Sequence, residues 1–386
     1  MGASQGRDQL ERLAGPRPAP GGSRALSEQC YRRSVRTTPC NASIYSRTLS
    51  PPMPPLKHLS LITSTGFPDY ALLDSGGGRK LERFGKIVVD RPEPQALWQP
   101  QLSNAEWGKA NCVFSASGED DEKGKWRIDK PVPESWLVKI PLAIVPAPSR
   151  HVEDMLPAWP SPRHGEAMLR MEGEREQAGI TILCKLAGLW HLGLFPEQGP
   201  HWAWMLSEIA KIKGETPRVL NLFGYTGAAS LLAAKAGAEV THVDASKKAI
   251  SWGRENQTAS KLDAAKVRWI VDDAAKFVAR EVRRGKTYHI ILVDPPKFGR
   301  GPEGEVWDLF THLPALLNDC AKLLASDAAM VLTVYAIRAS ALSFDQLMRD
   351  TLKGKGGTFD TGELAIQADG GHAVPTSLFV RWSAIP

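Results

Sequence analysis

A carboxylate held rigidly at the end of an apolar strand is the strongest chemical signal in the sequence. The run His289–Val293 is followed directly by Asp294-Pro295-Pro296-Lys297-Phe298. Because proline presets φ, this turn would project Asp294 and its neighbouring carbonyl groups in one direction. Such oxygens can accept hydrogen bonds from an exocyclic amine while the ring of Phe298 stacks on a base. The structural alternative is a stiff turn between a strand and a loop.

A glycine-containing turn, Asn221–Gly227, comes at the end of another predicted strand. Gly224 and Gly227 permit unusual φ and ψ angles and let the backbone approach a ligand closely. The helix behind the turn offers free N–H groups to a carboxylate. The turn lacks the three glycines of a dinucleotide fingerprint, and turns with two such glycines are common. By itself it indicates a ligand site only weakly.

Acidic residues also end the next two predicted strands. Asp244 lies 23 residues after Asn221, where a carboxylate can accept both hydroxyls of a ribose. The alternative is a helix N-cap formed by Asp244 or Ser246, and both roles can coexist. Asp272 and Asp273 end the following strand. A side-chain oxygen there can accept from an adenine amino group, with capping again the alternative.

These residues need a framework of strands and helices, and the sequence predicts one from about Trp202 onward. The predicted strands are Arg218–Phe223, Glu239–Asp244, Val267–Val271, His289–Val293 and Ala329–Tyr335. The predicted helices are Trp202–Lys213, Ala228–Ala236, Ser246–Ser260, Ala274–Arg284, Trp307–Leu324 and Phe344–Leu352. The chain closes with a hairpin of Glu363–Gln367 and Ser377–Trp382. The alternation indicates an α/β fold with a mainly parallel, Rossmann-like sheet. With its closing antiparallel hairpin it resembles the class I S-adenosylmethionine-dependent methyltransferases.

Residues 53–200 are expected to form a small β-rich module with a proline-rich connector. The predicted strands are Tyr70–Leu73, Arg79–Val89, Trp126–Ile128, Trp136–Ile140 and Ile180–Leu186. Turns are predicted at Asp74–Gly78 and Asp120–Lys125, and the connector at Pro141–Arg163. Eight of the twelve tryptophans lie between Trp98 and Trp204. Such residues can stack on bases, but more often they build a small β core.

The composition excludes several classes of protein. A chain of 386 residues is long enough for two domains. No stretch approaches 18 consecutive apolar residues, which excludes a transmembrane helix. The five cysteines lie far apart without a CxxC pair, which argues against a disulfide scaffold or a structural zinc site. The cysteines fit a reducing, cytoplasmic location. No metal is expected.

The net charge of +6 comes mainly from the first 52 residues. They hold eight arginines, no lysine and three acids, so the other 334 residues carry 40 basic and 39 acidic groups. Bulk charge is therefore no evidence for nucleic-acid binding. We interpret residues 1–52 as a disordered basic arm, a transit-like presequence, or sequence upstream of a working start at Met53. By the resemblance to class I methyltransferases, residues 201–386 would form the S-adenosylmethionine-dependent methyltransferase domain.

Taken in order, the strand-end motifs resemble the large-subunit ribosomal RNA methyltransferases that modify cytosine or guanine. The motifs are Val219–Gly227, Val243–Ser246, Asp272-Asp273 and Val293–Phe298, within a similarity that covers about residues 180–340. His191–Gln198 is similar to the family's loop at the opening of the cofactor site. Gly78–Gly85 is similar to the amino-terminal β module of a bacterial subgroup. The motifs are specific for a methyltransferase and much less specific for its substrate.

The resemblance implies S-adenosylmethionine as cofactor and ribosomal RNA as partner. By the same resemblance, Asn221, Gly224 and Gly227 would contact the methionine moiety. Asp244 would hold the ribose, Asp273 or Asp272 the adenine, and Asp294 would face the methyl acceptor. The implied sites further include Phe223, Tyr225 and Ser246 for the cofactor, and Pro295, Pro296 and Phe298 for catalysis.

Two differences from that family bear on the substrate. Its cytosine-5 members carry a nucleophilic cysteine just after the fifth strand, whereas Val331–Arg338 contains none. The family's separate RNA-binding domain of PUA type is not recognisable. Methylation at carbon-5 of cytosine needs a thiolate to attack the ring, because carbon-5 is not nucleophilic enough until an adduct forms. We therefore predict direct methyl transfer to a base of ribosomal RNA without a cysteine adduct. The alternatives are a methyltransferase of a protein or small molecule, and a non-catalytic RNA-binding protein with a degenerate methyltransferase fold.

Overall fold

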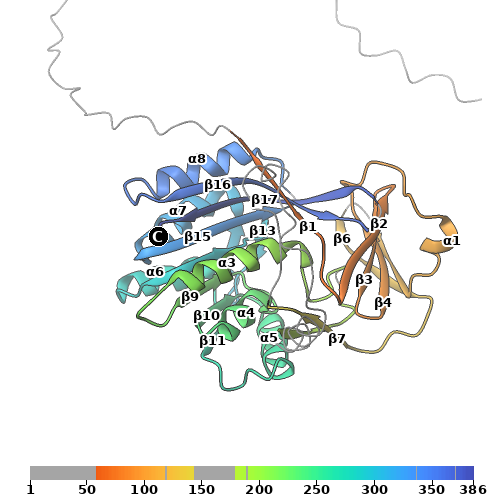
Figure 1. The fold of residues 1–386 in the computed structure, drawn as a ribbon, viewed down its shortest axis with the longest axis horizontal. Helices are drawn as coiled ribbons and strands as arrows, with labels where there is room; N and C mark the ends of the chain where they lie inside the picture. Colours follow the sequence, from red (N-terminus) through yellow and green to blue (C-terminus); the bar gives the residue numbers. More distant parts are fainter. Residues whose placement is uncertain (1–57, 118–119, 143–178, 188–189, 336, 370) are drawn as a thin grey trace, which may run out of the picture. The chain divides into compact units, whose positions relative to one another are not determined.

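The structure is a computed structural model, shown in Figure 1, that describes residues 58–117, 120–142, 179–187, 190–335, 337–369 and 371–386. The chain divides into two units, Met1–Pro54 and Pro55–Pro386. The predicted tail of residues 1–52 and most of the proline-rich connector lie outside the described residues. The account below therefore concerns the second unit.

An eight-stranded sheet forms the centre of this unit, with the strand order β1-β16-β17-β15-β12-β9-β10-β11. Five strands carry or flank the predicted site: β9 (Arg218–Leu222), β10 (Glu239–Asp244), β11 (Val267–Val271), β12 (Tyr288–Val293) and β15 (Leu324–Tyr335). The others are β1 (Ser60–Ser64), β16 (Thr358–Gln367) and β17 (Ala373–Ser383). Only β17 runs antiparallel to its neighbours β15 and β16. The predicted mainly parallel sheet with a closing antiparallel hairpin is confirmed.

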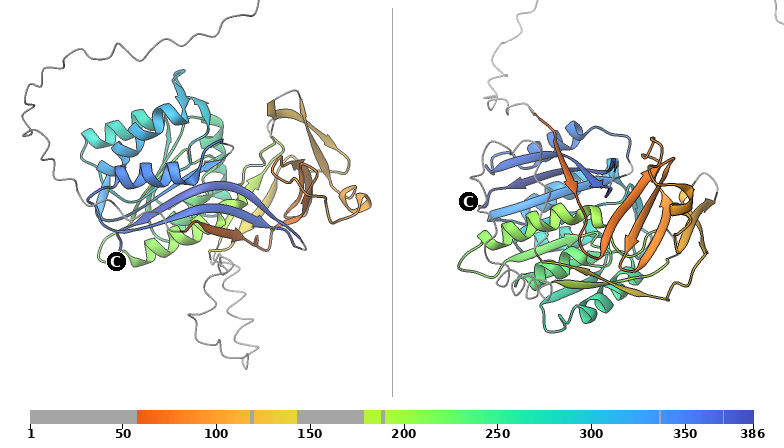
Figure 2. Two further views of the ribbon diagram at one scale, coloured as in Figure 1. Left: turned by 90° about the horizontal axis from the view of Figure 1, so that it is seen from above. Right: turned by 45° about the vertical axis from the view of Figure 1, so that its right-hand side comes forward.

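Among the described residues, six helices cover the two faces of this sheet. Three of them, α3 (Gly199–Lys211), α4 (Ala228–Lys235) and α5 (Lys247–Ala259), contribute to one hydrophobic cluster. The second cluster contains α6 (Ala274–Arg283), α7 (Leu309–Lys322) and α8 (Ala341–Thr351). Alternate residues of the central strands enter the two clusters, as Ile290 and Ile291 of β12 do, because successive side chains in a strand point to opposite faces. Figure 2 shows the green helix α3 and the blue and teal helices on opposite sides of the sheet.

A five-stranded sheet precedes the helices. Its strands are β2 (Tyr70–Gly76), β3 (Arg79–Phe84), β4 (Ile87–Pro92), β5 (Cys112–Ser117) and β6 (Asp120–Ile128), with α1 (Asn104–Trp107) before β5. A separate ladder joins β7 (Trp136–Ile140) to β8 (Ile180–Cys184). The hydrophobic cluster that holds α3 and α4 continues into β2, β3 and β4. The predicted β-rich character of this region is confirmed.

Four details of the sequence prediction are wrong. The predicted turn Asp74–Gly78 is limited to Gly77 and Gly78, because β2 continues to Gly76 and pairs there with β3. The expected strand Arg79–Val89 is two strands, because Gly85 adopts a φ of 60° and turns the chain between them. Asp120–Lys125 is not a charged turn but the first part of β6, where it pairs with β5. Trp307 does not begin a helix: it lies in β14 (Val306–Asp308), which pairs with β13 (Phe298–Arg300), and Asp308 caps α7.

Candidate active site

The predicted site residues follow strands that are neighbours in the central sheet. The last residues of β9 and β12 pair, Leu222 with Val293, and Leu222 also lies level with Val243 of β10. Asp244 itself pairs with Val271 of β11. Since the carboxyl ends of parallel strands share one edge, the turns after these four strands converge there. The structure thus brings the four strand-end motifs together.

The turn after β9 has an unusual backbone conformation. Phe223 and Tyr225 adopt φ angles of 57° and 53°, and Gly227 one of 87°. Positive φ at a bulky residue costs on the order of 1 kcal/mol or more and persists only where the surroundings enforce it. The Gly224 N–H donates to Val243 O at 3.1 Å, which ties the turn to β10. This strain is a signal of function that the sequence did not reveal.

The glycines of this turn make room for protein side chains. A Cβ on Gly224 would lie 2.4 Å from Cε1 of His242, and one on Gly227 would lie 2.6 Å from Cη2 of Trp269. Asn221 is buried, and its Nδ2 donates to Ser230 Oγ at 2.9 Å. Residues 224 and 227 are therefore glycines because the rings of His242 and Trp269 leave no room for a Cβ atom. The Asn221 side chain supports the turn from within the core.

Asp244 joins the turn to the start of α5. Its Oδ2 accepts the Tyr225 N–H at 2.8 Å and its Oδ1 accepts the Ser246 N–H at 2.8 Å. Ser246 is the N-cap of α5, since its Oγ accepts the Ala249 N–H at 3.2 Å. Burial raises the pKa of Asp244 although both backbone hydrogen bonds lower it. Each carboxylate oxygen keeps a further lone pair for a ligand hydroxyl.

The two acids after β11 have different partners. Asp273 is the N-cap of α6, and its Oδ1 accepts the Lys276 N–H at 2.9 Å. Asp272 forms an ion pair with Arg280, and its backbone N–H donates to Asp244 O at 3.1 Å. Capping is therefore the observed role of the Asp273 side chain. The backbone of Asp272 is fixed to the residue that ends β10.

Asp294 follows a strand in which every residue is buried. Its Oδ2 accepts from Nε2 of Gln198 at 3.2 Å, while its Oδ1 is buried without a hydrogen-bond partner among the described residues. Burial, and next the charge of Glu197, raises the pKa of Asp294 to about 7. A buried oxygen without a donor costs about 1–3 kcal/mol. Asp294 is thus held ready to accept a hydrogen bond from a ligand.

The residues after Asp294 form a fixed turn with an exposed aromatic ring. Pro296 O accepts from Nε1 of Trp307 at 2.8 Å, and Lys297 O accepts the Leu309 N–H at 3.0 Å. Pro295 is buried. Phe298 is 63% exposed at the start of β13, and Lys297 Nζ lies 5.3 Å from its ring centre, so most of the ring surface remains accessible to a ligand.

Glu197 and Gln198 were not predicted as site residues. They belong to the 3-10 turn η1 (Pro196–Gln198), which lies directly before α3. Thr226 Oγ1 donates to Gly193 O at 2.5 Å, and the Phe195 ring lies 5.3 Å from the ring of Tyr225. Glu197 and Gln198 could have been identified from the resemblance of His191–Gln198 to the loop at the opening of a cofactor site.

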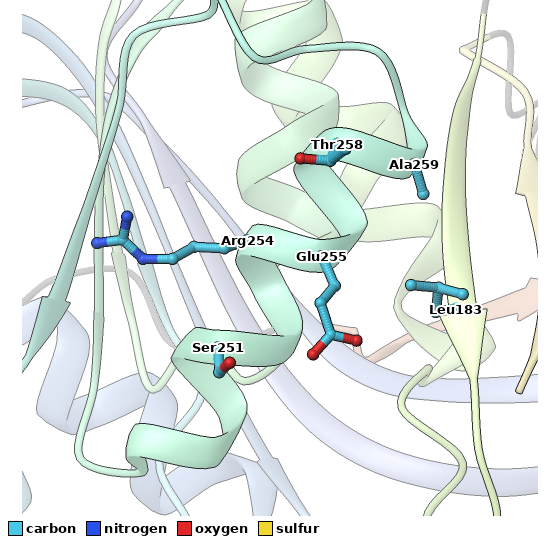
Figure 3. Close-up of a pocket in the computed structure, with 6 residues that line it drawn as sticks. All are labelled: Leu183, Ser251, Arg254, Glu255, Thr258 and Ala259. Atoms are coloured by element: carbon cyan, nitrogen blue, oxygen red, sulfur yellow. The ribbon is translucent and has the colours of Figure 1, made fainter. Parts of the chain in front are cut away.

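A surface pocket of about 550 Å³ lies elsewhere, on α5 beside β8 (Figure 3). Its lining residues are Leu183, Ser251, Arg254, Glu255, Thr258 and Ala259. None of them belongs to a strand-end motif, and Glu255 forms an ion pair with Lys185 at 2.6 Å. Two further findings concern the part of the chain that the structure describes. It contains no helix long and apolar enough to cross a membrane, and no group of three potential metal ligands.

Two curated ribosomal RNA methyltransferases match parts of the chain. The large subunit methyltransferase K/L of Shewanella frigidimarina is 30% identical over 164 residues, which cover 42% of this chain and 22% of that protein. The large subunit methyltransferase I of Tolumonas auensis is 36% identical over 124 residues, which cover 32% of this chain and 30% of that protein. The chain therefore matches less than a third of the length of either relative.

The family of S-adenosylmethionine-dependent methyltransferases matches residues 193–353, which include every predicted site residue. The crystal structure of the SAM-dependent methyltransferase from Agrobacterium tumefaciens is 43% identical, with a TM-score of 0.73. That similarity covers 85% of this chain and 95% of the Agrobacterium chain. Because it extends over nearly the whole of that enzyme, the chain belongs to the S-adenosylmethionine-dependent methyltransferases.

Proposed function

We propose that the enzyme methylates a nitrogen of a base in ribosomal RNA by direct transfer from S-adenosylmethionine. The observation that carries this proposal is Asp294, whose Oδ1 is buried and lacks a hydrogen-bond donor among the described residues. An N–H group of a base edge would supply the missing donor.

The residues at the strand ends fit the cofactor. The bound cofactor supplies an electrophilic methyl group on a positively charged sulfur. Asp244 has lone pairs left for two ribose hydroxyls after accepting the Tyr225 and Ser246 amides. Asp272, whose backbone N–H donates to Asp244 O, and Asp273 after it in the chain would contact the adenine. The strained turn from Asn221 to Gly227 would receive the methionine moiety, and Phe223, Tyr225 and Ser246 would complete the site.

Asp294, Pro295, Pro296 and Phe298 would form the acceptor site. The prolines and the hydrogen bonds of their turn keep Asp294 in place. Asp294 would accept a hydrogen bond from the acceptor nitrogen and orient its lone pair, while the exposed Phe298 ring stacks on the base. Catalysis would then come chiefly from placement and charge stabilisation.

The described cysteines support transfer without a covalent adduct. Cys112, Cys184 and Cys320 are all buried. Burial raises the pKa of the Cys112 thiol to about 12 and raises the pKa of Cys184 and Cys320 further. A thiol in such surroundings is a poor nucleophile because the thiolate is the attacking species. The end of β15, Thr333–Tyr335, has no cysteine either.

The names of the curated relatives support ribosomal RNA as the substrate, and with it a cytoplasmic location.

The test of this proposal is the transfer of labelled methyl groups to extracts of a strain that lacks the enzyme. We expect the label in large-subunit ribosomal RNA, in a nucleoside that is methylated on a nitrogen atom. The Asp294→Ala variant should not incorporate this label. Label in protein or small molecules instead would replace the proposal with the alternative substrate class.

A further inference from the structure

Gln198 holds the carboxylate of Asp294 from a loop that lies 96 residues earlier in the chain. Its Nε2 donates to Asp294 Oδ2 at 3.2 Å, and this is the one hydrogen bond to that carboxylate within the ranges that the structure describes. The prolines after Asp294 fix the backbone of the turn, but the last side-chain torsion of an aspartate has only broad minima. The hydrogen bond from Gln198 therefore determines which way each carboxylate oxygen points.

The other carboxylate oxygen is left for a ligand. Asp294 Oδ1 is buried, and no donor among the described residues reaches it. The carbonyl groups that follow already have partners: Pro296 O accepts from Trp307 Nε1 at 2.8 Å. Likewise, Lys297 O accepts the Leu309 N–H at 3.0 Å. Since buried polar groups are nearly always hydrogen-bonded, the single unpaired oxygen at the end of β12 marks the point at which a donor must arrive.

The role of Gln198 in its own helix does not explain its side chain. Gln198 is the N-cap residue of α3, yet its side chain makes no capping hydrogen bond. At the same position in α5, α6 and α7, the side chains of Ser246, Asp273 and Asp308 each accept a backbone N–H of their own helix. Glutamine is also not among the residues that favour an N-cap. The contact with Asp294, rather than the start of α3, accounts for a glutamine here.

A residue that positions another must itself be held, and the loop before α3 is held by the turn after β9. Thr226 Oγ1 donates to Gly193 O at 2.5 Å, and the ring of Phe195 lies 5.3 Å from that of Tyr225. The backbone N–H of Gln198 then donates to Phe195 O at 3.1 Å. The amide that reaches the acceptor motif thus starts from a backbone fixed against the proposed cofactor turn.

We propose that Gln198 is a positioning residue of the transfer reaction, which donates to Asp294 Oδ2 and thereby turns Oδ1 toward the N–H group of the methyl acceptor. This inference rests on the proposed nitrogen acceptor. Gln198 acts through Asp294 and contacts neither the acceptor nor the cofactor. Misplacing a reacting group by about 1 Å can lower a rate on the order of 100-fold. Loss of the Gln198 amide should therefore lower kcat and leave binding nearly unchanged.

The first test removes the hydrogen bond with little change in volume. The full chain transfers labelled methyl groups to an extract of a strain that lacks the enzyme, and the amount of extract is varied. Gln198→Met should lower kcat about 10-fold to 100-fold. The KM for the acceptor and the calorimetric Kd of S-adenosylmethionine should stay close to those of the unaltered enzyme. Gln95→Met is the matched control, because Gln95 is exposed and its Nε2 donates to Pro375 O, also at 3.2 Å.

The second test reverses the direction of the hydrogen bond by combining Gln198→Glu with Asp294→Asn. At alkaline pH the introduced carboxylate can only accept, so the introduced amide must turn its NH2 group toward it and its oxygen toward the acceptor. Gln198→Glu alone places two carboxylates together, and Asp294→Asn alone allows an NH2 group to face the acceptor. The double variant should therefore exceed either single variant in kcat by about tenfold or more. A residue that only stabilised the fold would show no such recovery.

Full kcat in Gln198→Met, or a double variant no more active than the single variants, would overturn the inference. The identity of the labelled molecule is a separate result. Label in protein or small molecules would remove the proposed RNA substrate, while the comparison of variants would still decide the role of Gln198.

Isotope labelling of glutamine gives a further readout that needs no acceptor and does not depend on the Gln198 variants folding. The side-chain amide signal of Gln198 in the nuclear magnetic resonance spectrum should shift on Asp294→Ala. It should stay in place on Glu255→Ala, which changes an exposed residue of α5. A Gln198 signal that Asp294→Ala leaves unmoved would equally overturn the inference.

Discussion

Asp244 Oδ2 accepts the backbone N–H of Tyr225 at 2.8 Å, so the carboxylate that ends β10 holds the strained turn that ends β9. The same residue that we assign to the ribose therefore also fixes the backbone assigned to the methionine moiety. Replacing Asp244 should therefore weaken the contacts to both the ribose and the methionine moiety of the cofactor.

Asp244→Ala should lower the affinity for S-adenosylmethionine at least tenfold. Each charge-assisted hydrogen bond that the carboxylate makes contributes about 1.5–3 kcal/mol. Calorimetry measures the affinity, and the melting temperature shows whether the fold survives. Glu239→Ala is the matched control, because Glu239 lies at the opposite end of the same strand in an exposed ion pair with Lys266. An unchanged affinity in Asp244→Ala would remove Asp244 from the cofactor site.

Asp294→Ala should lose most of the methyl transfer to RNA, whereas Cys320→Ser should keep it. The carboxylate orients the acceptor, while the Cys320 thiol is buried in α7 and stays protonated. Transfer of labelled methyl groups measures both variants. A covalent adduct trapped on RNA that contains 5-fluorocytosine, and lost in Cys320→Ser, would instead establish the cytosine-5 mechanism.

Phe298→Ala should weaken RNA binding without destabilising the protein. The ring is mostly exposed, so its loss should change the free energy of unfolding by no more than about 0.5 kcal/mol. Loss of stacking on a base costs about 1–3 kcal/mol, which should raise KM for RNA between 5-fold and 150-fold. Phe310→Ala is the control, since Phe310 is similarly exposed in the first turn of α7. Equal effects of the two variants would argue against a stacking role for Phe298.

A chain that begins at Met53 should keep the melting temperature and the cofactor affinity of the full chain. The second unit begins at Pro55, and its first strand begins at Ser60. Residues 1–52 also have little apolar content from which to build a core. Thermal unfolding and calorimetry measure the two properties. A clear fall in melting temperature would show that the removed residues pack against the rest.

The strand-end residues could be predicted because their signals are local. Asp294 follows an apolar run and precedes two prolines, and each of these features is visible within a few residues. Gln198 could not be identified this way, because its partner Asp294 is 96 residues away. The sequence also could not show why residue 224 is a glycine, because the ring that leaves no room for a Cβ atom there belongs to His242 in the next strand. Trp307 was assigned to a helix because the short β13–β14 hairpin has little periodicity.

The pairing of β1 with β16 has a consequence for how the protein is made. Ser60 lies level with Gly362, so the edge of the catalytic sheet is closed by a segment synthesised about 300 residues before its partner (Figure 1). On the ribosome β1 must wait until almost the whole chain has emerged, and contacts between such distant segments form slowly. A chain cut after Ser64 would leave β16 as an open edge that can pair with other chains. A chain that begins at Thr65 should therefore aggregate more readily than one that begins at Met53 and keeps β1.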